Sequence, residues 1–216
     1  MSRPIPETRE IVVQLRWLGL RLWQRQDFFG FTEDSLALAE FVGEQPECQH
    51  ICDLGSGSGG LLFLVWAKNQ QAVCQGLEII PENVALAERS KQLNAALPGL
   101  LANCRFQLGD WRTPWLYFAP QSFDLLVSNP PYQPLGAGRV SPNRQRAAAR
   151  TECFGSLAEL LSSANWLLRP AGQLALVLPV SRQPELHRLL AANNFQITRE
   201  QAQNKLLLLA AQKAAQ

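Results

Sequence analysis

The chain has 216 residues, of which 47% are hydrophobic and 18% are charged, and its formal net charge is +2. This length allows one domain with a sizeable core, and the composition is that of an ordinary globular protein. The sequence has no run of 18 apolar residues, and its first ten residues lack the apolar core of a secretory signal. We therefore expect a single domain over residues 1–216, no membrane span and a cytoplasmic location.

The N-terminal part of the chain is weakly patterned. We expect a short helix over residues 7–17 and a short strand over residues 20–24. Asp34 then opens an amphipathic helix over residues 34–44, because its carboxylate can accept hydrogen bonds from the free amides of a first turn. We treat residues 1–33 as an N-terminal extension and residues 34–216 as the core of the domain.

Strands and helices alternate over the rest of the chain. The expected helices cover residues 60–69, 81–96, 156–168 and 185–192. The expected strands cover residues 49–55, 71–79, 104–110, 122–129, 173–180, 195–202 and 204–212, the last two forming a hairpin. This order predicts an α/β fold, a doubly wound and mostly parallel seven-stranded sheet with helices on both faces and an antiparallel last strand. Ligands bind such sheets at the carboxyl ends of the strands.

A glycine-rich turn follows the first strand of this sheet. Residues 53–60 read DLGSGSGG, and Gly55, Gly57 and Gly59 permit backbone angles and close approaches that a Cβ would forbid. Such a turn between strand and helix is typical of nucleotide-binding sites. Gly55, Gly57 and Gly60 also satisfy the spacing of dinucleotide-binding proteins, so the turn alone leaves a nicotinamide cofactor open.

An acidic residue follows each of three successive strands. Glu78 could accept hydrogen bonds from both hydroxyls of a ribose, and Asp110 could accept one from an adenine amino group, with Trp111 beside the ring. Asp53 lies where a dinucleotide would place its pyrophosphate. A carboxylate repels phosphate but tolerates a sulfonium or ammonium group, so charge favours S-adenosyl-L-methionine over a dinucleotide. Capping of the following turns is the alternative for Asp53 and Asp110.

Four short motifs occur in a familiar order: DLGSGSGG, GLEI at residues 76–79, GD at 109–110 and NPPY at 129–132. Together they resemble the class I S-adenosylmethionine-dependent methyltransferases, and LLRPAGQLALVLP resembles the turn into the fifth strand of that family. The resemblance covers roughly residues 26–212. It implies a Rossmann-like fold and S-adenosyl-L-methionine as cofactor, bound by Asp53, Gly55, Ser56, Gly57, Gly59, Glu78, Ile79, Asp110, Trp111 and Asn129.

Asn-Pro-Pro-Tyr resembles the catalytic motif of the family members that methylate amino groups. The Asn129 side chain and the Pro130 carbonyl could accept hydrogen bonds from the two N–H groups of an amine and stabilise the charge that develops during attack. Pro130 and Pro131 make that carbonyl rigid, and Tyr132 could stack on a base. The alternative is a proline-terminated strand that leads into a loop.

The flanking segments suggest which amine is methylated. Residues 138–152, GRVSPNRQRAAARTE, resemble the loop after the catalytic motif in bacterial tRNA(Val) adenine-N6 methyltransferases. The segment from Gln26 resembles the part of those enzymes that lies over the cofactor, with Gly30 and Asp34 at matching positions. The resemblance therefore implies methylation of adenine N6 in RNA, namely tRNA near the anticodon. Adenine in rRNA, guanine N2 and a protein glutamine are the alternatives, and a catalytically idle RNA- or partner-binding module is the non-enzyme alternative.

A basic run supports RNA as the partner. Residues 139–150 contain Arg139, Arg144, Arg146 and Arg150 and no acid, so these side chains could bind phosphates; a solvated loop is the alternative. Phe28, Phe29 and Phe31 could shield the cofactor or the base, or simply pack in the core.

A bound metal is not expected. Cys48, His50 and Cys52 lie close together, but their spacing matches no common zinc site. A nicotinamide-linked dehydrogenase would need a proton relay, and His50 and His187 lie away from the motifs. The sequence does not predict an oligomeric state.

Overall fold

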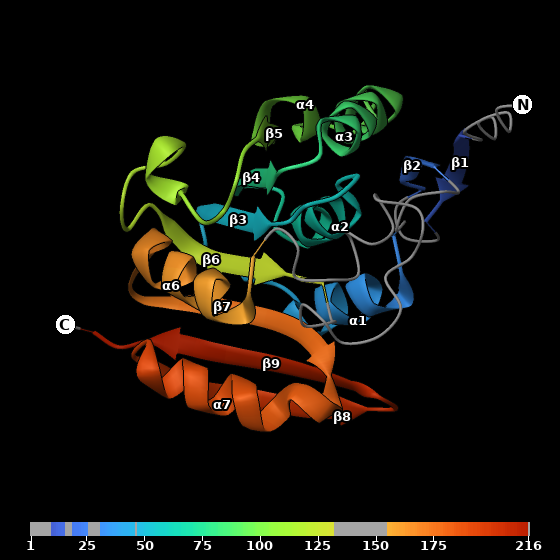
Figure 1. The fold of residues 1–216 in the computed structure, drawn as a ribbon. Coiled ribbons are helices and arrows are strands. Elements are labelled where there is room, and N and C mark those ends of the chain that lie inside the picture. The colour runs from blue at the N-terminus through green and yellow to red at the C-terminus, as the bar shows by residue number, and fades with distance from the viewer. Residues whose placement is uncertain (1–9, 16–18, 26–30, 46, 132–154, 216) are drawn as a thin grey trace, which may run out of the picture.

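The computed structural model describes residues 10–15, 19–25, 31–45, 47–131 and 155–215. Its centre is a seven-stranded sheet in the order β5-β4-β3-β6-β7-β9-β8 (Figure 1). Strands β3 to β7 pair in parallel, and β9 runs antiparallel between β7 and β8. The strands are β3 (His50–Leu54), β4 (Val73–Glu78), β5 (Cys104–Leu108), β6 (Phe123–Ser128), β7 (Leu168–Pro179), β8 (Phe195–Gln203) and β9 (Leu206–Lys213). The predicted fold class is confirmed.

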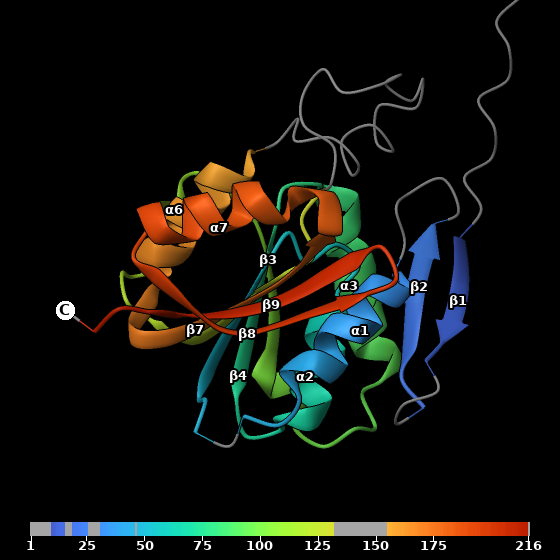
Figure 2. The same ribbon diagram turned by 90° about the horizontal axis from the view of Figure 1, so that it is seen from below.

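Helices cover both faces of the sheet (Figure 2). Helices α6 and α7 lie on one face, and α1, α2 and α3 lie on the other. Their bounds are α1 (Glu33–Val42), α2 (Gly60–Lys68), α3 (Pro81–Leu93), α6 (Leu157–Leu167) and α7 (Gln183–Ala192). The sequence did not predict three short helices, which are α4 (Leu100–Asn103), η1 (Pro114–Leu116) and η3 (Val180–Arg182). None of the helices in the described residues has the length and hydropathy of a membrane-spanning segment.

Two hydrophobic clusters hold the helices to the sheet. One contains Phe63 and Trp66 of α2 together with residues of α1, and the other contains Leu160 of α6 and Leu186 of α7. The central strands β3 and β6 contribute to both clusters, because successive side chains of a strand point to opposite faces. This explains why strands covered on both sides read as nearly continuous apolar runs.

The helix predicted over residues 7–17 is wrong. The structure has a strand there, β1 (Glu10–Gln14), which pairs antiparallel with β2 (Arg21–Arg25) to form a separate two-stranded sheet. The run Ile11, Val12, Val13 explains the difference, because β-branched side chains favour the extended backbone. The strand predicted over residues 20–24 is present as β2.

The β1–β2 hairpin is fastened to α3 by side chains of the helix. The Trp23 amide donates to Ser90 Oγ at 2.9 Å, and the Arg21 amide donates to Asn94 Oδ1 at 2.9 Å. Asn94 Nδ2 donates in return to the Arg21 carbonyl at 2.7 Å. These bonds satisfy one edge of β2, which the small sheet alone would leave unpaired.

Strand β7 begins five residues earlier than predicted. Leu168 already pairs with Phe123, whereas the next pair joins Leu125 to Gln173, so residues 169–172 bulge out of the ladder. Ala171 has a φ of 60°, which fits such an irregular turn. The segment Arg-Pro-Ala-Gly therefore lies within the bounds of β7, after α6 has ended at Leu167.

Candidate functional site

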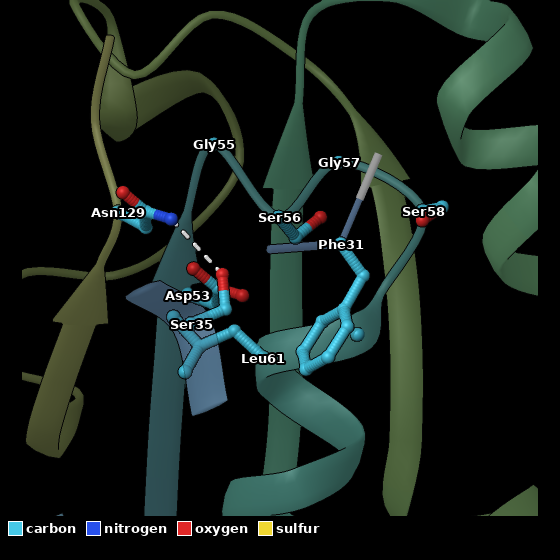
Figure 3. A pocket seen from close by; sticks show the side chains of 10 residues that line it. Phe31, Ser35, Asp53, Gly55, Ser56, Gly57, Ser58, Leu61 and Asn129 are labelled. Carbon is cyan, nitrogen blue, oxygen red and sulfur yellow. Dashed lines mark hydrogen bonds between the residues drawn. The ribbon is translucent and has the colours of Figure 1, made fainter. Parts of the chain in front are cut away.

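A pocket lies at the carboxyl ends of β3 and β6, beside the N-terminus of α1 (Figure 3). Parallel strands end at the same edge of a sheet, and here β3 and β6 are direct neighbours. The pocket is lined by Phe31, Ser35, Asp53, Gly55, Ser56, Gly57, Ser58, Gly60, Leu61 and Asn129. The turn from β3 to α2 thus forms one wall, and the residues that follow β6 and open α1 form the other.

Two positions at the end of the turn require glycine, because of a positive φ angle at Gly59 and because a Cβ would clash at Gly59 and Gly60. Gly59, the N-cap of α2, has a φ of 87°, and a Cβ there would lie 2.7 Å from Cζ of Phe106. A Cβ on Gly60 would lie 2.4 Å from Cδ2 of Phe31. The absence of side chains at these positions lets the Phe31 ring lie against the start of α2 and close that side of the pocket.

Asp53 is the most unusual residue of the pocket. Its side chain is buried, with only 1% of the residue exposed, and neither carboxylate oxygen has a hydrogen-bond partner among the described residues. Burial raises the pKa of Asp53 well above its usual range, and repulsion from Glu78 raises it further. A buried carboxyl without a partner destabilises a fold, so its place in a pocket points to a positively charged or hydrogen-bond-donating ligand.

Glu78 supports the turn and does not line the pocket. Its Oε2 accepts a hydrogen bond from the Gly57 amide and its Oε1 accepts one from the Ile80 amide, both at 2.8 Å. Burial raises the pKa of Glu78, while these bonds act to lower it. The carboxylate holds the turn in shape, and the ribose contact expected from the sequence stays a prediction.

Asp110 and Trp111 also lie outside the pocket lining. Asp110 forms an ion pair with Arg112 at 2.6 Å and accepts a hydrogen bond from its amide at 2.9 Å. Partial burial acts to raise the pKa of Asp110, but its hydrogen bonds to Arg112 outweigh burial and lower it. Trp111 is buried, and a Cβ on Gly55 would lie 2.9 Å from its Cζ3. The tryptophan thus packs against the glycine turn, and the adenine contact of both residues stays a prediction.

Asn129 follows β6 and faces the pocket. Its Nδ2 donates to Ser35 Oγ at 2.9 Å and lies 3.5 Å from Thr32 Oγ1. Figure 3 shows the amide nitrogen directed at Ser35 and the amide oxygen directed the opposite way. The preceding residue, Ser128, donates to the Leu54 carbonyl at 2.6 Å, so the end of β6 is tied to the end of β3. The residue that follows Asn129 in the chain, Pro130, is buried.

The predicted site residues fall into three groups. Those that line the pocket are Asp53, Gly55, Ser56, Gly57 and Asn129. Those that are described but do not line it are Asp34, Gly59, Glu78, Ile79, Asp110, Trp111, Pro130 and Pro131. Those that lie outside the described residues are Gly30, Tyr132, Arg139, Arg144, Arg146 and Arg150.

The pocket also contains residues that the sequence analysis did not select. Ser58 belongs to the glycine-rich turn, and Gly60 and Leu61 are the first two residues of α2 directly after it. The motif over residues 53–60 could have included Ser58 and Gly60. Ser35 belongs to no motif in the sequence, so nothing marked it as a site residue. The sequence analysis also placed the start of the helix at Asp34, whereas α1 begins at Glu33 with Thr32 as its N-cap. This shift of the helix start places Asp34 in the first turn and lets Ser35 face the pocket.

Three residues with metal-binding side chains, Cys48, His50 and Cys52, lie at and just before the start of β3. No group of three or more histidine, cysteine or acidic residues able to hold a metal occurs in the part of the chain that the structure describes. Burial, together with the charges of the nearby Asp124 and Glu47, raises the pKa of the Cys48 thiol to about 11, so the free thiol stays protonated at neutral pH.

The pocket fits S-adenosyl-L-methionine on its own chemistry. The unpartnered carboxylate of Asp53 suits the positive charge of a sulfonium or an ammonium group. The Ser56 hydroxyl is also buried without a hydrogen-bond partner among the described residues, which offers a further polar contact. The glycine turn leaves room for a ligand to approach the backbone.

Known proteins resemble this chain in sequence and in fold. The chain is 35% identical over 164 residues to the tRNA1(Val) (adenine(37)-N6)-methyltransferase of Porphyromonas gingivalis, a match over 74% of this chain and 62% of the relative. It is 30% identical over 204 residues to the release factor glutamine methyltransferase of Rhodospirillum rubrum, over 88% of this chain and 58% of the relative. The chain thus spans about three fifths of the length of these relatives.

The fold matches a crystal structure of a predicted O-methyltransferase, protein Atu636 from Agrobacterium tumefaciens. The TM-score is 0.64 at 22% identity, over 85% of this chain and 82% of the other. The family described as "Methyltransferase domain" matches residues 47–214, which include the whole seven-stranded sheet. The cofactor of this family is S-adenosyl-L-methionine, and the chain belongs to the class I S-adenosyl-L-methionine-dependent methyltransferases.

Proposed function

We propose that this chain methylates the N6 amino group of an adenine in tRNA. One observation carries the proposal: the Asn129 carboxamide lines the same pocket as Asp53 and the glycine turn. A side chain able to hold an amine therefore lies beside the groups suited to a positively charged methyl donor. S-adenosyl-L-methionine supplies a methyl group on a sulfonium when it is bound.

The chemistry asks the protein to activate a weak nucleophile. The lone pair of the adenine amine is delocalised into the ring, so the nitrogen must become more pyramidal before it can attack. Asn129 Oδ1 and the Pro130 carbonyl accept hydrogen bonds from its two N–H groups and stabilise the positive charge that builds up on the nitrogen. Pro130 and Pro131 hold that carbonyl rigid, and Ser128 anchors the end of β6. Tyr132 stacks on the base.

The relatives define the competing substrate. The P. gingivalis relative is named for adenine N6 in tRNA, and the R. rubrum relative is named for a glutamine of a release factor. A glutamine amide is also a planar nitrogen with a delocalised lone pair, so the same two acceptors would serve it. Adenine in rRNA and guanine N2 fit the acceptors as well. This chain covers less than two thirds of the length of either relative, so the substrate of a relative cannot simply be transferred to it. A direct test of the substrate is needed.

The test uses the full chain and S-adenosyl-L-methionine labelled in the methyl group. Separate reactions contain total tRNA, total rRNA and a release factor, and the labelled product is digested and identified by mass spectrometry. We expect label in N6-methyladenosine from tRNA. Label in glutamine, in rRNA or in guanine would replace the proposed substrate with that one. Heat of binding with the cofactor but no transfer to any substrate would favour an idle binding module.

The arginines at 139, 144, 146 and 150 are proposed to bind phosphates of the RNA. An RNA loop base is already partly unstacked, so binding needs mainly contacts to the flanking backbone. Replacing all four by alanine should reduce the slope of log affinity against log salt by about 3, at roughly 0.7 per phosphate contact. An unchanged slope for tRNA binding in a salt series would remove these residues from the interface.

A further inference from the structure

We propose that Ser35 is a positioning residue that fixes the orientation of the Asn129 carboxamide. The inference rests on the proposed function, because it concerns how the amine acceptor is aimed. Ser35 belongs to α1, whereas Asn129 follows β6, so the two residues are 94 positions apart in the chain. Neither the glycine turn nor Asn-Pro-Pro-Tyr contains the serine.

The geometry is that of one well-formed and partly buried hydrogen bond. Asn129 Nδ2 lies 2.9 Å from Ser35 Oγ, and only 7% of Ser35 is exposed. Both side chains line the pocket. Thr32 Oγ1 lies further away, at 3.5 Å, so Ser35 is the stronger acceptor of the two. Helix α1 packs through buried Leu38 and Ala39 into the same core as α2, which makes the serine a fixed support.

The chemistry requires one orientation of the carboxamide. An asparagine side chain has a donor end and an acceptor end that differ little in shape. The target amine presents N–H donors, so only the oxygen of Asn129 can bind it. A flipped carboxamide would present its own N–H bonds to the amine and repel it. The bond to Ser35 occupies the nitrogen on the side of α1 and directs the oxygen away from the helix (Figure 3).

Loss of the Ser35 hydroxyl should therefore affect turnover more than binding. Ser35→Ala removes the near acceptor of Asn129 Nδ2 and with it the preference for the productive orientation. We expect kcat to fall about ten-fold, because the free energy of one lost hydrogen bond raises the barrier by about that factor in rate. The KM for tRNA should change by less than about two-fold, since the RNA contacts remain. Ser35→Thr keeps the hydroxyl and should recover most of the rate.

A double-mutant cycle separates positioning from a general structural effect. If Ser35 acts through Asn129, Ser35→Ala should slow the wild-type enzyme but not the Asn129→Ala variant. The matched control is Ser90→Ala in α3. Ser90 is also buried and its Oγ donates to the Leu86 carbonyl at 2.7 Å, but it lies outside the pocket lining. This control should lower the melting temperature and leave kcat unchanged.

The experiment measures kcat and KM with tRNA at saturating cofactor, together with melting temperatures of all variants. Ser35→Cys provides a second variant of similar size with a poor acceptor, in case Ser35→Ala fails to fold; it should be slow as well. An unchanged kcat in Ser35→Ala or Ser35→Cys, or an equal further loss in the Asn129→Ala background, overturns the positioning role. A wild-type protein that methylates no adenine overturns the proposed function instead, and the two failures are distinguished by the wild-type reaction alone.

Discussion

Two aspartates in neighbouring strands show how the two ends of the sheet differ. Asp124 lies near the amino end of β6. Its Oδ2 accepts hydrogen bonds from the Gln49 and His50 amides at 2.9 and 2.8 Å, and its Oδ1 pairs with Arg169 at 2.6 Å. Asp53 lies near the carboxyl end of β3, more deeply buried, and neither of its oxygens has a partner among the described residues.

The comparison distinguishes side chains that stabilise the fold from side chains that are suited to bind a ligand. At the amino end, Oδ2 of Asp124 joins β6 to the start of β3, and Oδ1 joins β6 to Arg169. At the carboxyl end, the fold tolerates a costly buried carboxyl. A stable protein keeps such a group where binding of another molecule compensates for it. Substitutions at the two ends should therefore have different signatures.

The largest effect is expected at the carboxyl end, on catalysis. Asn129→Ala removes the acceptor for the amine, and kcat should fall by about 100-fold or more, as for loss of one oxyanion-hole donor. The affinity for S-adenosyl-L-methionine, measured by calorimetry, should change far less. A variant that methylates tRNA at the wild-type rate would contradict the role given to this end of the sheet.

A loss of stability without a catalytic effect is expected at the amino end. Asp124→Ala leaves the Gln49 and His50 amides without their acceptor and should lower the free energy of unfolding by about 1–2 kcal/mol. Urea titration would measure this loss. The kcat of the folded fraction should match the wild type, and a kcat that falls while stability is kept would remove the distinction between the two ends.

The smallest effect has the opposite sign. Asp53→Asn removes a buried carboxyl that resists ionisation, so without cofactor at pH 7 the variant should be more stable by about 1 kcal/mol, or roughly 2–4 °C in Tm. The raised pKa means that the native state of the wild type favours the protonated carboxyl. Its stability is therefore full below about pH 4, where an unfolded aspartate titrates, and declines as pH rises toward the raised native value.

The stabilisation by Asp53→Asn should accordingly disappear well below about pH 4, because the carboxyl is then neutral in both the native and the unfolded state. The same variant should bind S-adenosyl-L-methionine more weakly at pH 7, since the negative charge that faces the ligand is gone. Melting curves across pH and a calorimetric titration measure the two effects. A variant that is destabilised at pH 7 would mean that Asp53 has a stabilising partner in the protein.

The sequence predicted the sheet well because the strands alternate with helices and carry clear apolar runs. It failed at residues 10–14, where a β-branched run was read as a helix although a pairing with β2 determines its structure. That Asp53 and Asn129 line one pocket could be predicted, because the carboxyl ends of neighbouring parallel strands meet. The contact of Asp110 with Arg112 depends on the shape of a turn, and that of Ser35 with Asn129 depends on where α1 begins. Neither follows from spacing in the chain.

The position of β9 has a consequence for how the protein is made. Among the described residues, one edge of β7 pairs with β9 along Gln173–Pro179, and β9 is the last strand of the sheet in chain order. Until residues 206–213 have left the ribosome, the apolar residues of β7 keep an open edge that can pair with other nascent chains. The sheet therefore cannot be completed before β9 has been synthesised, and a chain that stops before Leu206 should aggregate rather than form a smaller enzyme.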